Sequence, residues 1–251
     1  NLWFVDIPFG RIFRITPKKD WELVTQYDGW PNGLKIHKDG SIWICDYKEG
    51  LLKLDPKTGK LETILRTAFS EGFKGLNDLH FASNGDLYFT DQGQTGLHDP
   101  TGRLYRLSPE GKLDVLISNI PSPNGVALSP DEKILYVTDG TLQPRGISAF
   151  DVAPDGTLGN RRPYTQSATA GPDGIKVDVR GNVWASWGGG TDPNEQGVRI
   201  FDPTGKPIGQ IVLPERAHNL AFGGRNRNRL FMTAQQSLYA LYVNTQGTKI
   251  A

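Results

Sequence analysis

The stretch Pro31-Asn32-Gly33-Leu34 opens a pattern that runs through the turn Asp39-Gly40 into the apolar run Ile42–Asp46. The same pattern returns four more times along the chain. The residues that take the place of Asn32 in the later copies are Asn77, Asn124, Asp173 and Asn219. Because they follow one another at separations of 45, 47, 49 and 46 residues, the sequence contains a structural repeat.

Each repeat consists of short apolar segments joined by hairpin turns. In the first complete copy, the segments Leu51–Leu54 and Leu61–Leu65 follow the first two. Four short strands in about 45 residues are typical of the blade of a β-propeller. The 30 Gly and 17 Pro among 251 residues also argue against a helical protein. We therefore predict an all-β fold, a six-bladed β-propeller.

The first blade is predicted to be incomplete. Trp3-Phe4-Val5-Asp6 matches the second strand of the repeat, and no opening motif precedes it. The first blade therefore lacks its innermost strand in this chain, and five complete openings make up the other blades. We interpret residues 1–251 as a single domain, with blades at approximately 1–29, 30–74, 75–121, 122–170, 171–216 and 217–251.

The charge balance excludes some classes of partner. The 28 basic and 27 acidic residues leave a net charge of +1, which gives no electrostatic reason to expect nucleic acid or a membrane surface. No apolar run approaches the roughly 20 residues that span a bilayer. The single cysteine, Cys45, forms no intrachain disulfide and favours a reducing compartment. We expect a cytoplasmic monomer or small homo-oligomer.

The repeated Asn and Asp residues are the first candidates for a functional site. Because the innermost strands of a propeller line its central channel, residues that open these strands converge at one end of it. Amide and carboxylate oxygens there suit Ca²⁺, Mg²⁺ or another divalent cation. The alternative is that Asn and Asp before Gly serve only as turn residues.

Aspartates at the ends of the second strands are the next candidates. Asp6, Asp46, Asp91 and Asp139 are expected on the same face, where a carboxylate near a metal could deprotonate a water. Capping of the following turn is the alternative role. Asp91 is the preferred catalytic residue because it precedes the long loop 92–102, which with loops 140–146 and 188–197 would form a rim that selects the substrate.

Other side chains are candidates for substrate contacts. His218 opens an inner strand, and His98 lies in a predicted rim loop. Trp187 could contact a substrate ring, with packing inside its blade as the alternative. Asn32 and Asp139 complete the predicted substrate contacts. The chain has no HExxH, CxxC or GxSxG motif and no phosphate loop, so the corresponding enzyme classes have no support.

Over essentially its full length, the chain resembles the gluconolactonase and senescence marker protein (regucalcin) family of six-bladed propellers. The motifs that carry the resemblance are Leu2-Trp3-Phe4-Val5-Asp6-Ile7, Leu76-Asn77-Asp78, Pro123-Asn124-Gly125-Val126-Ala127-Leu128-Ser129, Tyr136-Val137-Thr138-Asp139 and Gly171-Pro172-Asp173-Gly174. The stretch Gln196–Phe201 with Pro207–Ile211 is similar to the bacterial drug-responsive lactonases.

The resemblance implies one divalent cation, held by a Glu of the first blade, an Asn of the fourth and an Asp of the fifth. The last two correspond to Asn124 and Asp173. Asn77 matches an Asn that contacts metal or substrate, Asp78 a carboxylate beneath the site, and Asp91 a carboxylate that some lactonases use near the metal. The blade spacing would put the Glu about eight residues before Asn1.

One position departs from the family pattern. Sugar lactonases have an Arg two residues before the Asn that Asn77 matches, and this chain has Gly75 there. The departure argues against an aldonolactone substrate.

We therefore predict a metal-dependent lactonase, a hydrolase that opens a small-molecule lactone to the hydroxy acid. Asp91 or Asp173 would act as the base, and Asn124, Asp173 and Asn77 would contact the metal. Ca²⁺ is the preferred ion, and Mg²⁺, Mn²⁺, Zn²⁺ and Fe²⁺ are alternatives. A phosphotriester (organophosphate) hydrolase using the same metal site and a non-catalytic NHL-like binding propeller are the alternative functions.

Overall fold

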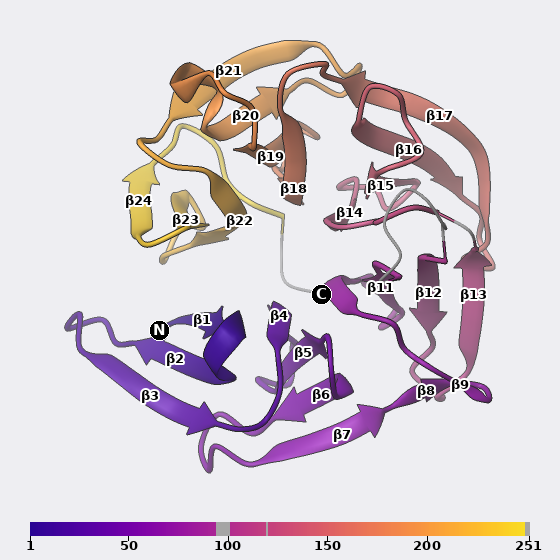
Figure 1. The fold of residues 1–251 in the computed structure, drawn as a ribbon, viewed down its shortest axis with the longest axis vertical. Helices are drawn as coiled ribbons and strands as arrows, with labels where there is room; N and C mark the ends of the chain where they lie inside the picture. The colour runs from indigo at the N-terminus through magenta and orange to yellow at the C-terminus, as the bar shows by residue number, and fades with distance from the viewer. Residues whose placement is uncertain (94–100, 119, 249–251) are drawn as a thin grey trace. The chain divides into compact units, whose positions relative to one another are not determined.

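The structure is a computed structural model that describes residues 1–93, 101–118 and 120–248. The chain divides into two compact units, Asn1–Pro123 and Asn124–Lys249. Figure 1 shows the first unit from indigo to magenta and the second from pink to yellow. In each unit, consecutive segments of the chain form antiparallel sheets whose neighbouring strands are also neighbours in the sequence.

The first unit contains three sheets of this kind and a small hairpin, β8–β9, among its described residues. The first sheet has three strands, and a 3-10 helix, η1 (Ile7–Phe9), follows β1. The strands of the unit are β1 (Leu2–Asp6), β2 (Arg11–Ile15), β3 (Trp21–Gln26), β4 (Pro31–Ile36), β5 (Ile42–Asp46), β6 (Gly50–Leu54), β7 (Leu61–Leu65), β8 (Thr67–Ala68), β9 (Glu71–Gly72), β10 (Leu76–Phe81), β11 (Leu87–Asp91), β12 (Arg103–Leu107) and β13 (Leu113–Ile117).

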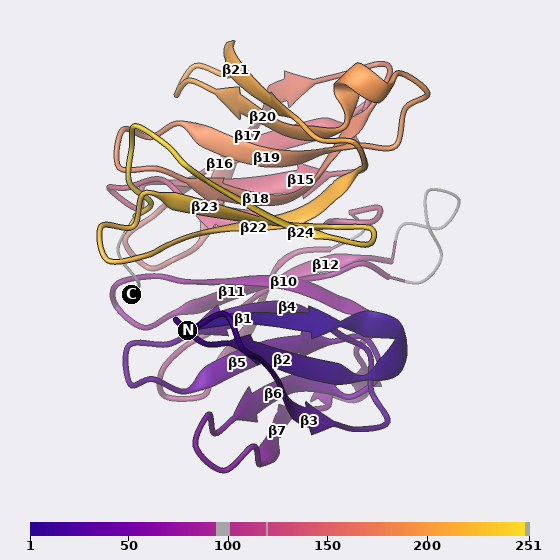
Figure 2. The same ribbon diagram turned by 90° about the vertical axis from the view of Figure 1, so that its left-hand side faces the viewer.

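The second unit also contains three sheets among its described residues, the last of them three-stranded. A 3-10 helix, η2 (Pro193–Glu195), precedes β20. The strands are β14 (Val126–Leu128), β15 (Ile134–Asp139), β16 (Gly146–Val152), β17 (Leu158–Gln166), β18 (Gly171–Val177), β19 (Val183–Gly188), β20 (Gly197–Phe201), β21 (Pro207–Val212), β22 (Ala217–Gly223), β23 (Arg229–Ala234) and β24 (Leu238–Tyr242). Figure 2 shows the strands of these sheets from the side.

The prediction of an all-β, six-bladed propeller is confirmed. Each sheet lies inside one of the predicted blades, and the first strand of the chain, β1, pairs with β2 at the outset of a three-stranded sheet. The sequence did not indicate that the last sheet would also have three strands within the described residues. Since β22 carries the opening motif with Asn219, the strands β22, β23 and β24 correspond to the first three of a blade.

Burial within a blade falls from the middle strands to the outermost one. All five residues of β11 are buried, whereas the outermost strand of the same sheet, β13, is half-buried or exposed along its length. Phe89 of β11 stacks on Tyr105 of β12 at a centroid distance of 5.2 Å, a contact that contributes roughly 0.5–1.5 kcal/mol beyond area burial. β11, the strand that ends at Asp91, is therefore packed within its sheet.

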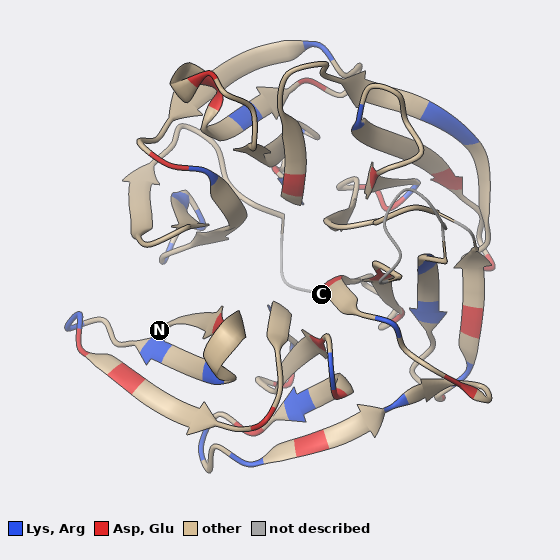
Figure 3. Cartoon of the chain, in the orientation of Figure 1, with Lys and Arg blue, Asp and Glu red and all other residues tan. Residues whose placement is uncertain are grey.

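The turns and the surface agree with the sequence pattern. Gly40, Gly85 and Gly181 have φ angles of 86°, 94° and 83°, a left-handed conformation that suits the hairpin turns between first and second strands. Basic and acidic residues are interspersed along the strands and turns of each unit (Figure 3). Cys45 is free and buried. None of the helices in the described residues has the length and apolar character that a membrane span requires.

Candidate functional site

The inner strands share an irregularity at the residues that the sequence singled out. A shift in pairing with the second strand is found in four of them: between Pro31 and Leu34 in β4, Leu76 and Leu79 in β10, Pro172 and Ile175 in β18, and Ala217 and Asn219 in β22. Bulges of this kind redirect side chains and are frequent near active sites. Asn32, Asn77 and Asp173 therefore lie at positions where the regular pairing of their strands is interrupted.

A glycine follows three of the repeated residues, Asn32, Asn124 and Asp173, and permits the next inner strand to come close. The φ angles of Gly33, Gly125 and Gly174 lie outside the left-handed region, so these glycines are not required by a turn. An added Cβ would lie 2.4 Å from the Asn77 carbonyl oxygen at Gly33, 2.6 Å from that of Asp173 at Gly125, and 2.3 Å from Asn219 Oδ1 at Gly174. Neighbouring motifs within a unit are thus packed against one another.

Hydroxyl groups of the second strands hold these openings. Thr138 donates to the Asp173 carbonyl at 2.8 Å, and Ser186 donates to the carbonyls of Gly174 at 2.9 Å and His218 at 2.8 Å. In the first unit, the Cys45 thiol lies 3.6 Å from the Asp78 carbonyl. This role is not predicted by the sequence, although the positions recur 13 or 14 residues after each repeated Asn or Asp.

In the second unit, Asp173 is the centre of a polar cluster. Its Oδ2 accepts hydrogen bonds from Arg216 Nη2 at 3.1 Å and lies 3.2 Å from His218 Nδ1. The Asp173 side chain is 16% exposed, and those of Arg216 and His218 are 32% and 44% exposed. The Gly125 backbone N–H donates to the Asp173 carbonyl at 3.2 Å, which brings the neighbouring Asn124 to the same region.

In the first unit, the polar residues at the opening of β10 and at the end of β11 are buried. Asn77, Asp78 and Asp91 are 4%, 2% and 2% exposed. Asp91 accepts backbone N–H groups from Lys74 at 2.9 Å and Gly93 at 3.1 Å, one on each oxygen. Burial raises the pKa of Asp91 above its usual value, against the opposing effect of these hydrogen bonds.

Asp46 and Asp139 make contacts of the kind that cap turns. Asp46 accepts the backbone N–H groups of Lys48 and Glu49, each at 2.7 Å, on one oxygen. The other oxygen accepts the Tyr27 hydroxyl at 2.6 Å. This hydrogen bond, together with burial as the larger cause, raises the pKa of Tyr27 far above its ordinary value.

Both oxygens of Asp139 also have partners. One accepts the Thr141 backbone N–H and hydroxyl, and the other accepts Ser148 and Arg161. This network favours the structural role considered for these aspartates. A contact between Asp139 and a substrate stays a prediction.

The other predicted contact residues have different surroundings. Trp187 is 1% exposed and packs against Phe201 and the Arg199 guanidinium, which favours the packing alternative. Asn32 is half-buried beside the bulge of β4. His98 lies outside the described residues, so nothing tests its predicted role.

The residues of the second unit fit the donor chemistry of a divalent cation. The hydrogen bonds that Asp173 accepts from described residues end on Oδ2, which leaves Oδ1 for another ligand. A carboxylate and the amide of Asn124 are hard oxygen donors of the kind that Ca²⁺ and Mg²⁺ prefer. Within the described part of the chain, no cluster of three or more His, Cys, Asp or Glu side chains forms a complete metal site.

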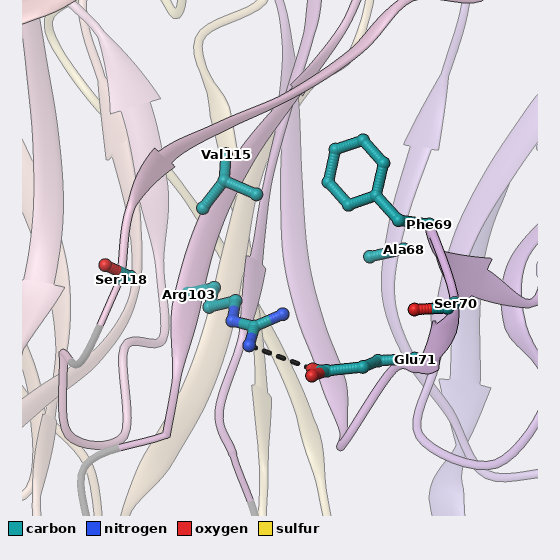
Figure 4. A pocket seen from close by; sticks show the side chains of 7 residues that line it. All are labelled: Ala68, Phe69, Ser70, Glu71, Arg103, Val115 and Ser118. Carbon is teal, nitrogen blue, oxygen red and sulfur yellow. Dashed lines mark hydrogen bonds and ion pairs between the residues drawn. The ribbon is translucent and has the colours of Figure 1, made fainter.

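A surface cavity in the first unit does not involve the predicted residues. It has a volume of about 360 Å³ and is lined by Ala68, Phe69, Ser70, Glu71, Arg103, Val115 and Ser118. Figure 4 shows Arg103 and Glu71 facing one another across it, joined by an ion pair of 2.9 Å. Phe69, one of its lining residues, is 70% exposed. We assign it no role in the candidate site.

Comparison with known proteins identifies relatives over most of the chain. A gluconolactonase from Zymomonas mobilis is 32% identical over 235 residues, which cover 86% of this chain and 64% of the relative. Lactonase drp35 from Staphylococcus epidermidis is 33% identical over 235 residues, covering 86% of this chain and 67% of the relative. The chain thus spans slightly less than two thirds of the Zymomonas protein.

Solved structures share the fold. A gluconolactonase from Xanthomonas campestris gives a TM-score of 0.84 at 26% identity, covering 96% of this chain and 81% of that one. Regucalcin from Agrobacterium tumefaciens gives 0.81 at 20% identity, covering 98% and 86%, and at that identity it shows the fold alone. The family described as "SMP-30/Gluconolactonase/LRE-like region" matches residues 1–236. The chain therefore belongs to the SMP-30/gluconolactonase/LRE-like family.

Proposed function

We propose that this protein is a metal-dependent lactonase that hydrolyses a small-molecule lactone to the corresponding hydroxy acid. The observation that carries the proposal is Asp173, a partly exposed carboxylate at a bulged inner strand beside Asn124, with one oxygen left for a ligand. The family and the names of the two lactonase relatives support the reaction class. They do not favour the phosphotriesterase or the binding-module alternative.

Asn124 and Asp173 would hold the cation, and Asn77 stays a predicted further contact. When bound, a divalent ion polarises the lactone carbonyl and stabilises negative charge on its oxygen. We propose Ca²⁺ first, because the donors are carboxylate and amide oxygens. The other divalent ions remain alternatives for the same donors.

Asp173 would also accept the proton of the attacking water. The water oxygen bonds to the carbonyl carbon, the bond from that carbon to the ring oxygen breaks, and the ring oxygen takes up a proton and leaves as the hydroxyl. His218, with Nδ1 at 3.2 Å from Asp173 Oδ2, would orient the carboxylate or pass on the proton. Asp91 is the second candidate for the base, and its raised pKa suits proton transfer.

The test is a panel of five- and six-membered lactones assayed with metal-depleted protein to which Ca²⁺, Mg²⁺, Mn²⁺, Zn²⁺ or Fe²⁺ is returned. We expect at least one lactone to be opened in a metal-dependent manner. Asn124→Ala and Asp173→Ala should lose turnover and bind the ion more weakly by calorimetry. Asp202→Ala, which changes a half-buried turn aspartate after β20 of the same blade, is the matched control. Hydrolysis of no lactone with any ion would overturn the proposal.

Other properties stay predictions from the sequence. They are a monomeric or small homo-oligomeric state, a cytoplasmic location and the absence of nucleic-acid or membrane partners. Size-exclusion chromatography with light scattering would determine the oligomeric state.

A further inference from the structure

Arg216 is a charged residue at the candidate site that the proposed reaction does not use. It lies immediately before β22, and its Nη2 contacts Asp173 Oδ2 at 3.1 Å. The two residues are 43 positions apart in the sequence: Asp173 lies in β18, and Arg216 directly precedes the first strand of the next sheet. Its role therefore has to be inferred from its surroundings.

A glycine surface lies along the Arg216 side chain. A Cβ added to Gly188 would lie 2.7 Å from Arg216 Cγ, and one added to Gly189 would lie 3.4 Å from Arg216 Nη1. Both glycines have positive φ angles, 153° and 91°. Any side chain at Gly188 would displace the arginine, because the Arg216 side chain packs directly against this backbone.

Gln196 forms hydrogen bonds with that backbone. Its side-chain amide donates to the Gly190 carbonyl at 3.1 Å, and its carbonyl oxygen accepts the Gly189 N–H at 3.4 Å. The loop belongs to the 188–197 segment that the sequence predicts as part of the substrate rim. The position of Arg216 is thus fixed by packing on this backbone as well as by the ion pair with Asp173.

The guanidinium has more donors than the protein uses. It carries five N–H groups, yet the described residues offer it a single acceptor, Asp173 Oδ2, and its buried Nε has no partner among them. By comparison, Arg106 of the first unit has two carboxylate partners, Asp114 at 2.6 Å and Asp86 at 3.9 Å. Arg216 is 32% exposed and can therefore take a further anionic partner.

The local charge selects the kind of anion. Planar guanidinium groups bind carboxylates through paired hydrogen bonds, and one guanidinium can bridge two carboxylates along different edges. The adjacent Asp173 already contributes one negative charge, which disfavours a doubly charged ligand such as phosphate. His218 lies against the same carboxylate and adds a second ring nitrogen near the cluster. A monoanionic carboxylate fits this site best.

We propose that Arg216, assisted by His218, forms a carboxylate-binding subsite that holds the carboxylate produced when the lactone ring opens. The inference rests on the proposed function, because ring opening converts a neutral ester into a carboxylate next to Asp173. In this role, Arg216 binds the charged product and makes no corresponding contact with the neutral substrate.

The experiment measures binding to metal-depleted protein by calorimetry, with 4-hydroxybutanoate as the carboxylate probe and butane-1,4-diol as its neutral counterpart. We expect 4-hydroxybutanoate to bind and the diol to bind much more weakly. Arg216→Gln should weaken carboxylate binding about tenfold or more, since it removes a charge-assisted hydrogen bond. Arg162→Gln, which removes an exposed ion pair elsewhere in the same unit, should bind like the wild type.

Arg216→Lys keeps the inference testable should Arg216→Gln fail to fold. It retains the charge but not the planar fork, so we expect a smaller loss than for Gln. Equal affinity of Arg216→Gln and wild type, equal affinity for acid and diol, or absence of carboxylate binding would overturn the subsite.

The two proposals fail separately. Lactone turnover without Arg216-dependent carboxylate binding would leave the lactonase proposal and remove the subsite. Arg216-dependent binding in a protein that opens no lactone would leave the carboxylate subsite and remove the lactonase proposal.

Discussion

The third and fifth blades have the same backbone irregularity at their openings, and their carboxylates differ in burial and in the groups that bind them. In the third, Asp78 and Asp91 are almost completely buried, and the oxygens of Asp91 accept main-chain N–H groups. In the fifth, Asp173 is partly exposed, and its contacts are with the charged or titratable side chains of Arg216 and His218. A carboxylate bound by main-chain groups is held rigidly, whereas one bound by side chains can exchange partners with a ligand.

The difference comes from residues outside the repeated motif. Arg216 stands three residues before Asn219, the place that Lys74 takes before Asn77. Lys74 contributes its backbone N–H to Asp91, while Arg216 contributes its side chain to Asp173. The repeat reproduces the backbone, and the residues that vary between copies determine the chemistry at each opening.

The largest effect is expected from neutralising the two carboxylates in turn. Asp173→Asn should lower lactone turnover by about 10²–10⁴-fold, the range for loss of a positioned general base. Asp91→Asn should lower turnover less and destabilise the fold, because an Asn amide would face a main-chain N–H donor. Steady-state kinetics and urea unfolding of both variants measure the two effects. A greater catalytic loss in Asp91→Asn than in Asp173→Asn would reverse the comparison.

Crowding the fifth opening tests how tightly it is packed. Gly125→Ala would bring a Cβ within 2.6 Å of the Asp173 carbonyl oxygen, and we expect a loss of about 1–3 kcal/mol in the free energy of unfolding. Gly171→Ala is the control, since a Cβ there meets nothing within 4 Å and the φ angle is not left-handed. Urea denaturation compares them. Equal stability of the two variants would show that the close approach carries no energetic weight.

Removing a hydroxyl that holds each opening should separate stability from activity. Thr138→Val loses the 2.8 Å bond to the Asp173 carbonyl and should cost about 0.5–1.5 kcal/mol of stability together with some turnover. Thr138→Ser retains the hydroxyl and should resemble the wild type. In the first unit, Thr90→Val removes the acceptor of the Asp78 N–H and should lower stability with little change in turnover. If Thr138→Val and Thr90→Val both lower stability and neither lowers turnover, the fifth opening has no special role in catalysis.

The smallest effect is a pH dependence of stability at the third opening. Burial raises the pKa of folded Asp91 above its unfolded value, so the folded protein binds this proton more tightly. The contribution of Asp91 to stability is therefore largest at low pH and falls as pH rises from the unfolded pKa through the folded one. Nearby Arg103 and Lys74 oppose the shift.

Urea unfolding of wild type and Asp91→Asn at a series of pH values isolates this contribution as a difference. That difference should decrease with rising pH across the window above the ordinary aspartate pKa. A difference that increases there would contradict the raised pKa.

Much of the fold could be predicted because its information is local. Short turns and the apolar second strands that follow them recur in every copy, so the repeat was visible from spacing alone. The residues of the candidate site were harder to predict from the sequence. The repeat predicts that Asn124 and Asp173 lie at the site, and this stays a prediction. For Trp187 the sequence left a rim contact and packing as alternatives, and the side chain is 1% exposed. Its apolar ring is compatible with either position, and only packing decides between them.

The sequence by itself determined the number of blades, the strand order within each blade and the recurrence of an Asn or Asp at the inner openings. Hydrogen bonding and side-chain alternation within a hairpin depend on residues close in the chain, so these features are visible in the spacing. Only the tertiary structure decided which of the carboxylates is bound by side chains. Asp173 meets Arg216 and His218 across 43 and 45 residues, because neighbouring blades pack their inner strands together through glycines that admit no side chain.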